Sequence, residues 1–510
     1  MATFKTVEAA ETAARAFDLK RLPADFIDDP YPYFHALREH DPVHRMPDGS
    51  YIITRYDDCE TLYKDAKTYS SDKKIEFRPK FGDSPLFEHH TTSLVFNDPP
   101  LHTQVRRAIA GALSPRAIAE MEIGLVELVD RLLNELERKG RETGQVDLIE
   151  DFASAIPVEI IGNLLGVPHD ERGPLRAWSL AILGAREPVL TDQQLKTGND
   201  AVTEFLAYLK ILTDDRRRNP GDPNKDVLTR LINGEHDGRK LTETELLQNC
   251  IFILNAGHET TTNLIGNALY TLLLWPEEKA RLMADPSLMR SAVEEVLRFE
   301  SSNQLGNRRV VASTVLGGVP MKEGDLITIA IAAANRDPKY FPDPDRFDVG
   351  RNPNRHLAFA SGIHVCAGMN VARLEGRIAL ERFLARFPDY RLTGEPVRSP
   401  RARFRGFVSL PAKVGCPREG ANDQCNGRHG RRRLLRRSFV VPGRDGGKRR
   451  GAPSAGGGGP DHAGRWAGHR RRLRLLRGQE FDGDRDDGAR SAFGPRREGL
   501  RCRAQRPADQ

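Results

Sequence analysis

The sequence predicts a mainly helical protein with a few small β-sheets, followed by a C-terminal tail of different character. Three observations support this fold class. Long amphipathic stretches cover residues 116–138 and 242–275, where apolar residues recur every three or four positions. Strand-like runs are few and short. The composition changes abruptly after Val414-Gly415, where an Arg- and Gly-rich stretch begins.

Helices account for most of the chain before that change. Ser114 and Pro115 mark the start of the helix over 116–138, because serine caps a first turn and proline fits its first position. A second long helix is expected over residues 242–275. A third helix-like run covers residues 369–387 and directly follows the most informative motif of the chain.

Strands are expected only where β-branched and aromatic residues cluster in short runs, at residues 50–55, 326–331 and 404–411. Between residues 337 and 361, four prolines interrupt any periodic pattern, so we expect irregular coil there. No internal repeat is detected. The strands therefore form small sheets beside a helical body.

We expect three segments: an N-terminal segment over 1–25, a folded domain over 26–415 and a low-complexity basic tail over 416–510. Residues 417–510 carry 24 Lys or Arg and 11 Asp or Glu, which leaves 54 and 60 in the other 416 residues. The body is therefore mildly acidic although the whole chain carries +7. The tail also holds 18 of the 45 glycines and has little to bury, so we expect it to be disordered.

Two other interpretations of the tail remain open. It could be a nucleic-acid-binding arm of the Arg–Gly type, although aromatic residues are sparse in it. It could also be a translation that continues out of frame beyond the natural end, which the abrupt change of composition favours. We expect no nucleic-acid partner.

Composition and patterning argue against several classes of protein. With 39% hydrophobic and 29% charged residues, the chain is typical of a soluble globular enzyme. It lacks the run of roughly 18 apolar residues that a membrane-spanning helix needs and the pattern of a secretory signal. Six scattered cysteines without a Cys-x-x-Cys pair argue against a disulfide framework or a zinc site. We expect a cytoplasmic protein that does not bind membranes.

The most informative segment is residues 359–368, Phe-Ala-Ser-Gly-Ile-His-Val-Cys-Ala-Gly. Cys366 lies where coil meets a helix N-terminus, which favours a thiolate. Gly362 permits a tight turn, Gly368 lets a flat ligand approach the helix, and Phe359 shields the sulfur from water. A buried thiolate needs a cation to ligate, and haem iron is the obvious candidate. The alternative is that Cys366 is only a small buried hydrophobe.

This segment resembles the haem-ligand loop of the cytochrome P-450 family, specifically its soluble bacterial members, at every defining position. Other motifs resemble the family's in the same order along the chain: Asp98-Pro99-Pro100-Leu101-His102 with Arg106, Ala256-Gly257-His258-Glu259-Thr260, Glu295-Val296-Leu297-Arg298 and Pro344-Asp345-Arg346-Phe347. The resemblance covers roughly residues 26–415. It implies the cytochrome P-450 fold, a haem cofactor with Cys366 as its axial thiolate, and Phe359 and Gly368 as cofactor contacts.

The resemblance also implies where the haem propionates bind. His102 and Arg106 are four residues apart, so they share a helix face, and together they suit a carboxylate. His364 resembles the family's other propionate contact. Arg308 is expected to be a further contact, chosen over the adjacent Arg309 because the family's spacing implies it.

The catalytic residues implied by the resemblance are Glu259 and Thr260, which follow Ala256-Gly257 in the middle of the long helix. Glycine there costs about 1 kcal/mol relative to alanine, and small residues leave room for a ligand. The threonine hydroxyl can bond back to a carbonyl and open the helix locally. An acid beside a hydroxyl suits proton delivery. In an isolated helix, the same residues would be a solvated carboxylate and a satisfied hydroxyl.

A structural network is also expected. Glu295 and Arg298 are three residues apart and therefore share a helix face. Such pairs are usually solvated surface charges. With Arg346 as the third partner that the resemblance implies, we expect a buried ion network that holds the coil beneath the haem.

The resemblance implies a haem-thiolate monooxygenase that inserts one oxygen atom from O2 into a small apolar organic substrate. No Gly-x-Gly-x-x-Gly follows a strand, so electrons are expected from NAD(P)H through a separate reductase and an iron–sulfur ferredoxin. Basic residues near the haem motifs should attract an acidic ferredoxin: Arg106, Arg107, Arg355 and Arg373. We expect a monomer.

Two alternatives to this function remain open. One is a haem-thiolate protein that does not hydroxylate, such as a peroxide user, a dehydratase or a sensor. The other is a nucleic-acid-binding protein that acts through its basic tail.

Overall fold

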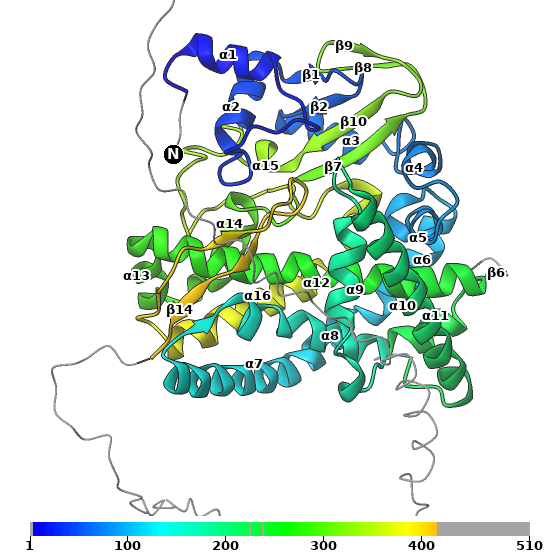
Figure 1. Ribbon diagram of the computed structural model, residues 1–510, viewed down its shortest axis with the longest axis vertical. Coiled ribbons are helices and arrows are strands. Elements are labelled where there is room, and N and C mark those ends of the chain that lie inside the picture. Colours follow the sequence, from blue (N-terminus) through cyan, green and yellow to red (C-terminus); the bar gives the residue numbers. More distant parts are fainter. Residues whose placement is uncertain (1–3, 224–225, 237–238, 416–510) are drawn as a thin grey trace, which may run out of the picture. The chain divides into compact units, whose positions relative to one another are not determined.

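The computed structural model describes residues 4–223, 226–236 and 239–415, so the tail expected over 416–510 lies outside the described residues. The described part confirms the mainly helical class (Figure 1). None of its helices is both long enough and apolar enough to cross a membrane. Its α-helices are α1 (Val7–Arg15), α2 (Tyr31–His40), α3 (Tyr56–Lys64), α4 (Lys74–Phe81), α5 (Pro85–Thr92), α6 (Leu101–Ala112), α7 (Pro115–Thr143), α8 (Ala155–Leu165), α9 (Leu175–Gly184), α10 (Asp192–Arg218), α11 (Val227–Asn233), α12 (Glu243–Leu274), α13 (Pro276–Ala284), α14 (Met289–Phe299), α15 (Ile331–Ala334) and α16 (Met369–Arg386).

The long helices begin where the sequence predicts. Ser114 Oγ accepts a hydrogen bond from Ala117 N at 3.3 Å and caps α7. At the start of α12, Thr242 Oγ1 accepts from Glu245 N at 3.2 Å, and Glu245 Oε2 accepts from Thr242 N at 2.9 Å. This reciprocal capping satisfies backbone N–H groups that the first turn cannot use internally.

The strands form one five-stranded sheet and several smaller ones. In the large sheet, the order is β1-β2-β10-β7-β3, with β2 and β10 parallel and the other pairs antiparallel. A three-stranded sheet has the order β11-β14-β4. The strands are β1 (Val43–Arg45), β2 (Tyr51–Ile53), β3 (Tyr69–Ser70), β4 (Val146–Asp147), β5 (Glu235–His236), β6 (Arg239–Lys240), β7 (Leu305–Val310), β8 (Thr314–Leu316), β9 (Val319–Met321), β10 (Leu326–Ala330), β11 (Arg391–Leu392), β12 (Val397–Arg398), β13 (Phe407–Ser409) and β14 (Pro411–Lys413).

The N-terminal helices pack beside the large sheet. Figure 1 shows α1 and α2 near β1 and β2, at the opposite end of the described fold from α7. Ala14, Phe17 and Leu19 are buried in one apolar cluster with Phe34 and Ile52. The segment boundary expected after residue 25 therefore falls within a shared core.

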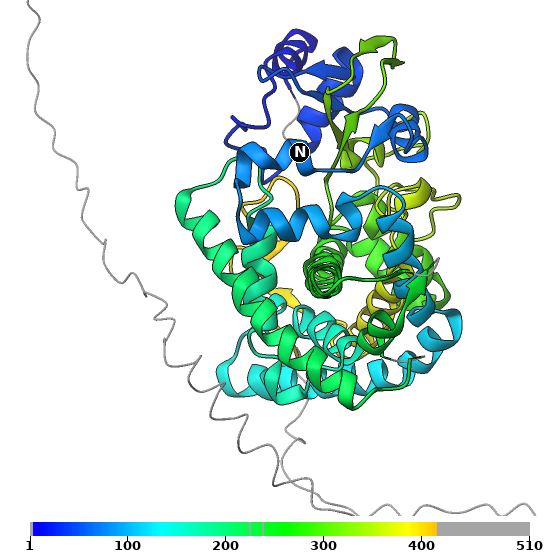
Figure 2. The same ribbon diagram turned by 90° about the vertical axis from the view of Figure 1, so that its right-hand side faces the viewer.

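Helix α12 lies at the centre of the helical part, where Figure 2 shows it end-on in green. It contacts α5, α8, α9, α10, α14 and α16. Even its polar side chains are buried: Asn267 Nδ2 donates to Glu300 O at 3.2 Å and to Arg405 O at 3.0 Å. Because neighbours hold α12 on most sides, its middle is a rigid wall on which a site can be built.

The predicted buried ion network exists, but one partner is different. Glu295 and Arg298 are fully buried and joined by two hydrogen bonds of 2.8 Å. Arg351 Nε donates to Glu295 Oε1 at 3.1 Å. Arg346 contributes only its backbone carbonyl, which accepts from Arg298 at 3.2 Å, while its side chain is exposed. The third charged partner is therefore Arg351, and the prediction of Arg346 was wrong.

Candidate functional site

The cysteine loop is a tight turn that ends at a helix N-terminus. It comprises the 3₁₀ turn η5 (Gly362–His364), then Cys366, and then α16. Cys366 N donates to Phe359 O at 2.9 Å and closes the loop. Gly362 has φ +67°, and a Cβ there would collide with the carbonyl of Tyr63, so a glycine is needed at this position.

The charge state of Cys366 is set by opposing effects. Burial raises the pKa of the Cys366 thiol, whereas the Gly368 N–H and the positive charges of Arg106 and Arg373 lower it. Burial is the largest effect, so the helix N-terminus alone does not favour the thiolate as the sequence suggested. A cation bound directly to the sulfur would supply the missing stabilisation.

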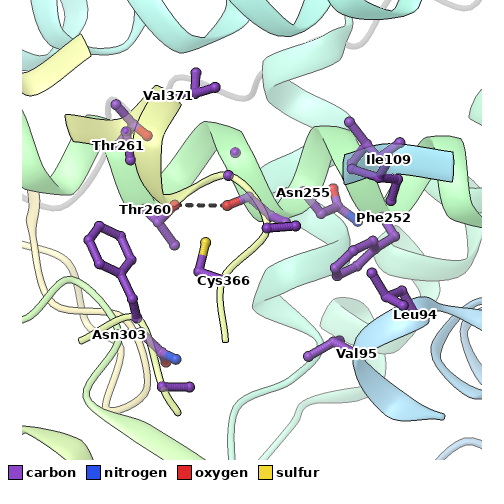
Figure 3. A pocket seen from close by; sticks show the side chains of 18 of the residues that line it. Leu94, Val95, Ile109, Phe252, Asn255, Thr260, Thr261, Asn303, Cys366 and Val371 are labelled. Carbon is purple, nitrogen blue, oxygen red and sulfur yellow. Dashed lines mark hydrogen bonds between the residues drawn. The ribbon is translucent and has the colours of Figure 1, made fainter. Parts of the chain in front are cut away.

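The sulfur opens into a cavity of about 320 Å³ whose lining comes mainly from α6, α12, α16 and the cysteine loop. Figure 3 shows Cys366 Sγ pointing toward the part of α12 that carries Thr260. Leu94, Val95 and Phe252 form an apolar wall on one side in the same view. The cavity thus places one soft donor opposite a hydroxyl, with apolar space beside them.

An unsatisfied group of basic side chains lies at the edge of this cavity. His102 and His364 have ring centroids 4.3 Å apart, and both line the cavity with Arg106. Neither ring nitrogen of buried His102 has a hydrogen-bond partner among the described residues, whereas His364 Nε2 lies 4.0 Å from Asp98 Oδ1, an ion-pair contact that is too long for a hydrogen bond. Arg106 Nη1 donates to Val365 O at 2.6 Å. Buried imidazoles without partners are costly, so this group suits carboxylates of a ligand.

The protonation of these histidines is set mainly by their burial. Burial lowers the pKa of His102 to about 4, and the nearby charges of His364 and Arg106 act in the same direction. Burial also lowers the pKa of His364, although Asp98 opposes the shift. Both rings are therefore neutral N–H donors at neutral pH, and an incoming carboxylate would favour their protonation.

Arg308 lies near this group but does not line the cavity. It is buried over the ring of Tyr63 at 5.1 Å, and Nη1 donates to Asn307 O at 2.8 Å. Its charge lowers the pKa of His364, which places it within electrostatic reach of that ring. For Arg309, no such influence on His364 is found, and its Nε is buried without a partner in the described part of the chain. This geometry favours Arg308 over Arg309.

Gly368 and Phe359 flank the sulfur as the sequence suggests. Both line the cavity, and a Cβ at Gly368 would meet no atom within 4 Å, so the space there is open for a flat ligand. The Arg373 guanidinium lies 4.9 Å from the centre of the Phe359 ring. The unpartnered imidazoles, the soft donor and this open cradle together fit a haem, with its propionates at the histidines and its iron at Cys366.

Thr260 bonds as the sequence predicts. Its Oγ1 donates to Ala256 O at 2.8 Å, which draws that carbonyl toward the cavity (Figure 3). Ala256 faces open space, whereas the missing side chain of Gly257 serves packing: a Cβ there would lie 2.6 Å from Ile161 Cδ1. The small side chain of Ala256 therefore leaves room for a ligand beside α12, whereas the missing side chain of Gly257 lets α8 pack closely against α12.

The structure does not bring Glu259 into the same cavity. Its carboxylate is buried in a neighbouring cavity of about 390 Å³, where Arg401 Nη1 donates to its two oxygens at 2.7 and 2.6 Å. Burial raises the pKa of Glu259, and the charge of Arg401 opposes this. Adjacent positions on a helix point about 100° apart. Glu259 and Thr260 therefore serve two cavities on different faces of α12.

One acidic residue of the cavity was missed by sequence reasoning. Glu375 of α16 is buried and lines the cavity, and burial raises its pKa to about 8, with Thr261 opposing the shift. At neutral pH it is therefore a protonated carboxylic acid. The sequence carries no local signal for it, because Arg373 and Arg377 flank Glu375 and make it resemble a residue of a solvated helix face.

Comparisons with known proteins agree with this geometry. A sequence profile described as cytochrome P450 matches residues 183–414. The cytochrome P450 monooxygenase PikC of Streptomyces venezuelae is 35% identical over 418 residues, which cover 80% of this chain and 97% of that protein. The vitamin D(3) 25-hydroxylase of Pseudonocardia autotrophica is also 35% identical, over 76% of this chain and 95% of that protein.

A solved structure of P450BioI in complex with acyl carrier protein ligated to hexadec-9Z-enoic acid is similar along its whole length. It has a TM-score of 0.72 and 32% identity, and the match covers 77% of this chain and 100% of that chain. Proteins of this family bind haem through a cysteine thiolate and are monooxygenases. The chain therefore belongs to the cytochrome P450 family of haem-thiolate oxidoreductases, which incorporate oxygen from O2 into their substrates.

Proposed function

We propose that Cys366 is the axial ligand of the haem iron and that this protein hydroxylates a small, largely apolar organic molecule. The observation that carries the proposal is the cavity itself. It has Cys366 Sγ on one side, the Thr260 hydroxyl on the facing helix, and the unpartnered nitrogens of His102 at its edge. Bound haem supplies the oxygen chemistry, which takes two electrons and two protons from outside and leaves one oxygen atom in the product.

The residues of the chain hold and orient that group. His102, Arg106 and His364 would donate hydrogen bonds to the propionates, and Arg308, whose charge reaches His364, would add positive charge nearby. Phe359 covers the sulfur, and Gly368 gives the ring room beside α16. These contacts would hold the haem in one orientation and keep water away from the sulfur, because the side chains are already in place before the haem binds.

Proton delivery involves both faces of α12. Thr260 donates its hydroxyl proton to the Ala256 carbonyl, and its oxygen faces the cavity. The hydroxyl can therefore accept a proton from a neighbouring donor and donate one to the reacting atoms. Glu375 is protonated at neutral pH and lines the same cavity, so it is a second candidate for proton storage. Glu259 stays a catalytic candidate, but it has to leave Arg401 before it can pass a proton toward Thr260.

Electrons come from NAD(P)H through a reductase and a ferredoxin, and the protein acts as a cytoplasmic monomer. Of the basic residues expected to attract the ferredoxin, Arg355 is exposed, whereas Arg373 is paired with Glu294 at 2.7 and 2.8 Å. Arg106 is engaged with Val365 O. Fewer basic residues than the sequence suggests are therefore available to attract an acidic ferredoxin. Raising the salt concentration should slow reduction of the haem moderately.

Replacement of the proposed ligand tests the assignment. In Cys366→Ala, the reduced protein under carbon monoxide should lose the red-shifted Soret band of a thiolate-ligated haem. Cys59→Ala is the matched control, because Cys59 is equally buried but lies in the core beside the large sheet. A red-shifted band that survives in Cys366→Ala would refute the ligand assignment. Product that forms with peroxide but not with NAD(P)H, ferredoxin and O2 would refute the oxygen-dependent reaction.

A further inference from the structure

Arg186 is a half-buried cation on the wall of the main cavity, just after the C-terminus of α9. It is one of the residues that line the cavity. Its guanidinium carbon lies 4.7 Å from the centre of the Phe96 ring and 5.5 Å from that of Phe404. Within the described residues, Arg186 has neither an ion pair with a carboxylate nor a side-chain hydrogen bond. The side-chain contacts that hold the guanidinium in place are therefore those with the faces of these two aromatic rings.

The acids closest to Arg186 are already bound to other residues. Glu259 accepts two hydrogen bonds from Arg401, and Glu76 accepts one of 2.6 Å from Lys73. Both carboxylates influence the pKa of Arg186 only at a distance. Neither is free to neutralise it without breaking its own ion pair.

The third nearby acid, Glu187, points elsewhere although it is next in sequence. Its Oε2 accepts from Ala402 N at 3.0 Å, and the side chain lines the neighbouring cavity. Its Oε1 has no hydrogen-bond partner in the described part of the chain, so Glu187 acts on Arg186 through its charge and not through an ion pair. Further positive charge lies close by, since burial and then Arg403 are the largest causes that lower the pKa of Arg186, to about 9. Arg186 therefore remains a cation at neutral pH, since Arg403 and burial are opposed by three carboxylates, none of which is paired with it directly.

This cation is separate from the group assigned to the haem propionates. The charges that most affect Arg186 are those of Arg403 and the three acids, and they do not include His102, Arg106 or His364. Conversely, Arg186 is not among the charges that act most strongly on His102 or His364. The cavity therefore contains two distinct places for an anion.

A half-buried guanidinium that makes neither an ion pair nor a hydrogen bond is costly, because the protein does not fully replace its lost hydration. The guanidinium of Arg186 lies over the faces of two aromatic rings, and its rim carries five N–H donors in a geometry that matches a carboxylate. Much of the surrounding wall is apolar, including Leu94, Val95 and Leu183. A ligand with one anionic end and an apolar body would satisfy both features at once.

We propose that the substrate of this enzyme is an apolar molecule that carries a carboxylate, and that Arg186 binds this carboxylate within the cavity. The inference rests on the proposed function, since it names the substrate class of the same site. It refines the expectation of a purely apolar substrate. A single guanidinium matches a monoanion, so a carboxylic acid is favoured over a phosphate ester.

Spectral titration of the full-length ferric holoenzyme tests the proposal, because a ligand that displaces water from the iron shifts the haem to high spin. The probes are two matched pairs, tetradecanoate with its methyl ester and 4-tert-butylbenzoate with its methyl ester. For at least one pair, the carboxylate should bind about tenfold or more tightly than the ester. Arg186→Gln should remove this preference, and Arg186→Lys should retain part of it.

Arg176→Gln is the matched control and should keep the full preference. Arg176 also lies in the α9 region, but it lines the neighbouring cavity and is paired with Glu150 at 2.6 Å. Each variant is first checked for the red-shifted Soret band under carbon monoxide. A normal band shows that the haem-thiolate assignment holds, so a failure of the carboxylate preference would then refute this inference alone.

Three results would overturn the proposal. Equal affinity for acid and ester in both pairs is the first, and the absence of any spectral shift with both carboxylates is the second. The third is a preference that persists in Arg186→Gln. If that variant keeps the preference but releases more peroxide per NAD(P)H, then Arg186 acts on the buried Glu259 rather than on the substrate.

Discussion

Replacing Glu375 by Gln should stabilise the protein, and more so as the pH rises. Burial raises the pKa of Glu375 to about 8 from its ordinary value of 4.5. Between these values the folded protein keeps the proton, whereas the unfolded chain releases it. The contribution of this group to stability is therefore fully present below pH 4.5 and is lost as the pH rises toward 8. Glutamine has a similar shape and carries no titrating proton.

The magnitude follows from the two pKa values. Holding the proton on Glu375 costs about 1.4 kcal/mol at pH 5.5 and about 4 kcal/mol at pH 7.5, since each tenfold change in proton concentration corresponds to about 1.4 kcal/mol. The gain in unfolding free energy of Glu375→Gln over the wild type should thus be larger at pH 7.5 by about 2.5 kcal/mol.

Urea denaturation of the full-length holoenzyme at both pH values measures this difference, with far-UV circular dichroism and Soret absorbance as probes. Glu381→Gln is the matched control on the same helix. Glu381 has half-exposed side-chain atoms and pairs with Arg377 at 3.4 Å, so its replacement should change stability little at either pH. A gain for Glu375→Gln that is the same at pH 5.5 and 7.5 would refute the assignment of a raised pKa. Lower turnover with preserved haem content is also expected, because the proton store is removed.

Three further outcomes are expected. Thr260→Ala should bind haem normally but release more hydrogen peroxide per NAD(P)H oxidised, because its hydroxyl no longer organises proton delivery; unchanged coupling would remove it from the mechanism. Arg298→Ala should lower the unfolding free energy by about 3–5 kcal/mol, since buried Glu295 then keeps only Arg351 as a charged partner, and a loss below 1 kcal/mol would contradict this. Gly257→Ala should cost about 1–3 kcal/mol in thermal or urea unfolding through overlap with Ile161, and the double variant with Ile161→Val should recover part of that loss.

Local patterns predicted the elements well because the signals for them are local. Thr242 and Glu245 are three residues apart in the sequence, and that spacing alone places the capping box of α12. The loop around Cys366 was equally predictable, since Gly362 and Gly368 lie beside the cysteine that they serve.

The errors arose where tertiary packing decides. Arg351 replaces Arg346 as the partner of Glu295, because the irregular coil between α15 and the cysteine loop has no period that fixes which side chain points inward. The catalytic role expected of Glu259 stays a prediction, but its position beside Arg401 follows from the rotation between adjacent helical positions, which separates it from Thr260.

The sequence also could not predict which polar side chains would be buried. Nothing local distinguishes Glu375 from the exposed Glu381 on the same helix, and only the packing of α16 against α12 separates them. The surroundings of Arg186 also could not be predicted from the sequence, because its guanidinium packs on Phe96 and Phe404, which are far apart in the chain.

The parallel pairing of β2 with β10 has a consequence for synthesis on the ribosome. Tyr51 of β2 is in register with Ile327 of β10, 276 residues later in the chain. At about 5–20 residues per second, the ribosome needs roughly 14–55 s to make that stretch. During this time Ile52 and Ile53, which are fully buried in the finished fold, have no partner strand on that side. Helices α5, α8, α9 and α10 precede α12 and can pack against it on the nascent chain, whereas the sheet closes only when residue 330 has left the exit tunnel.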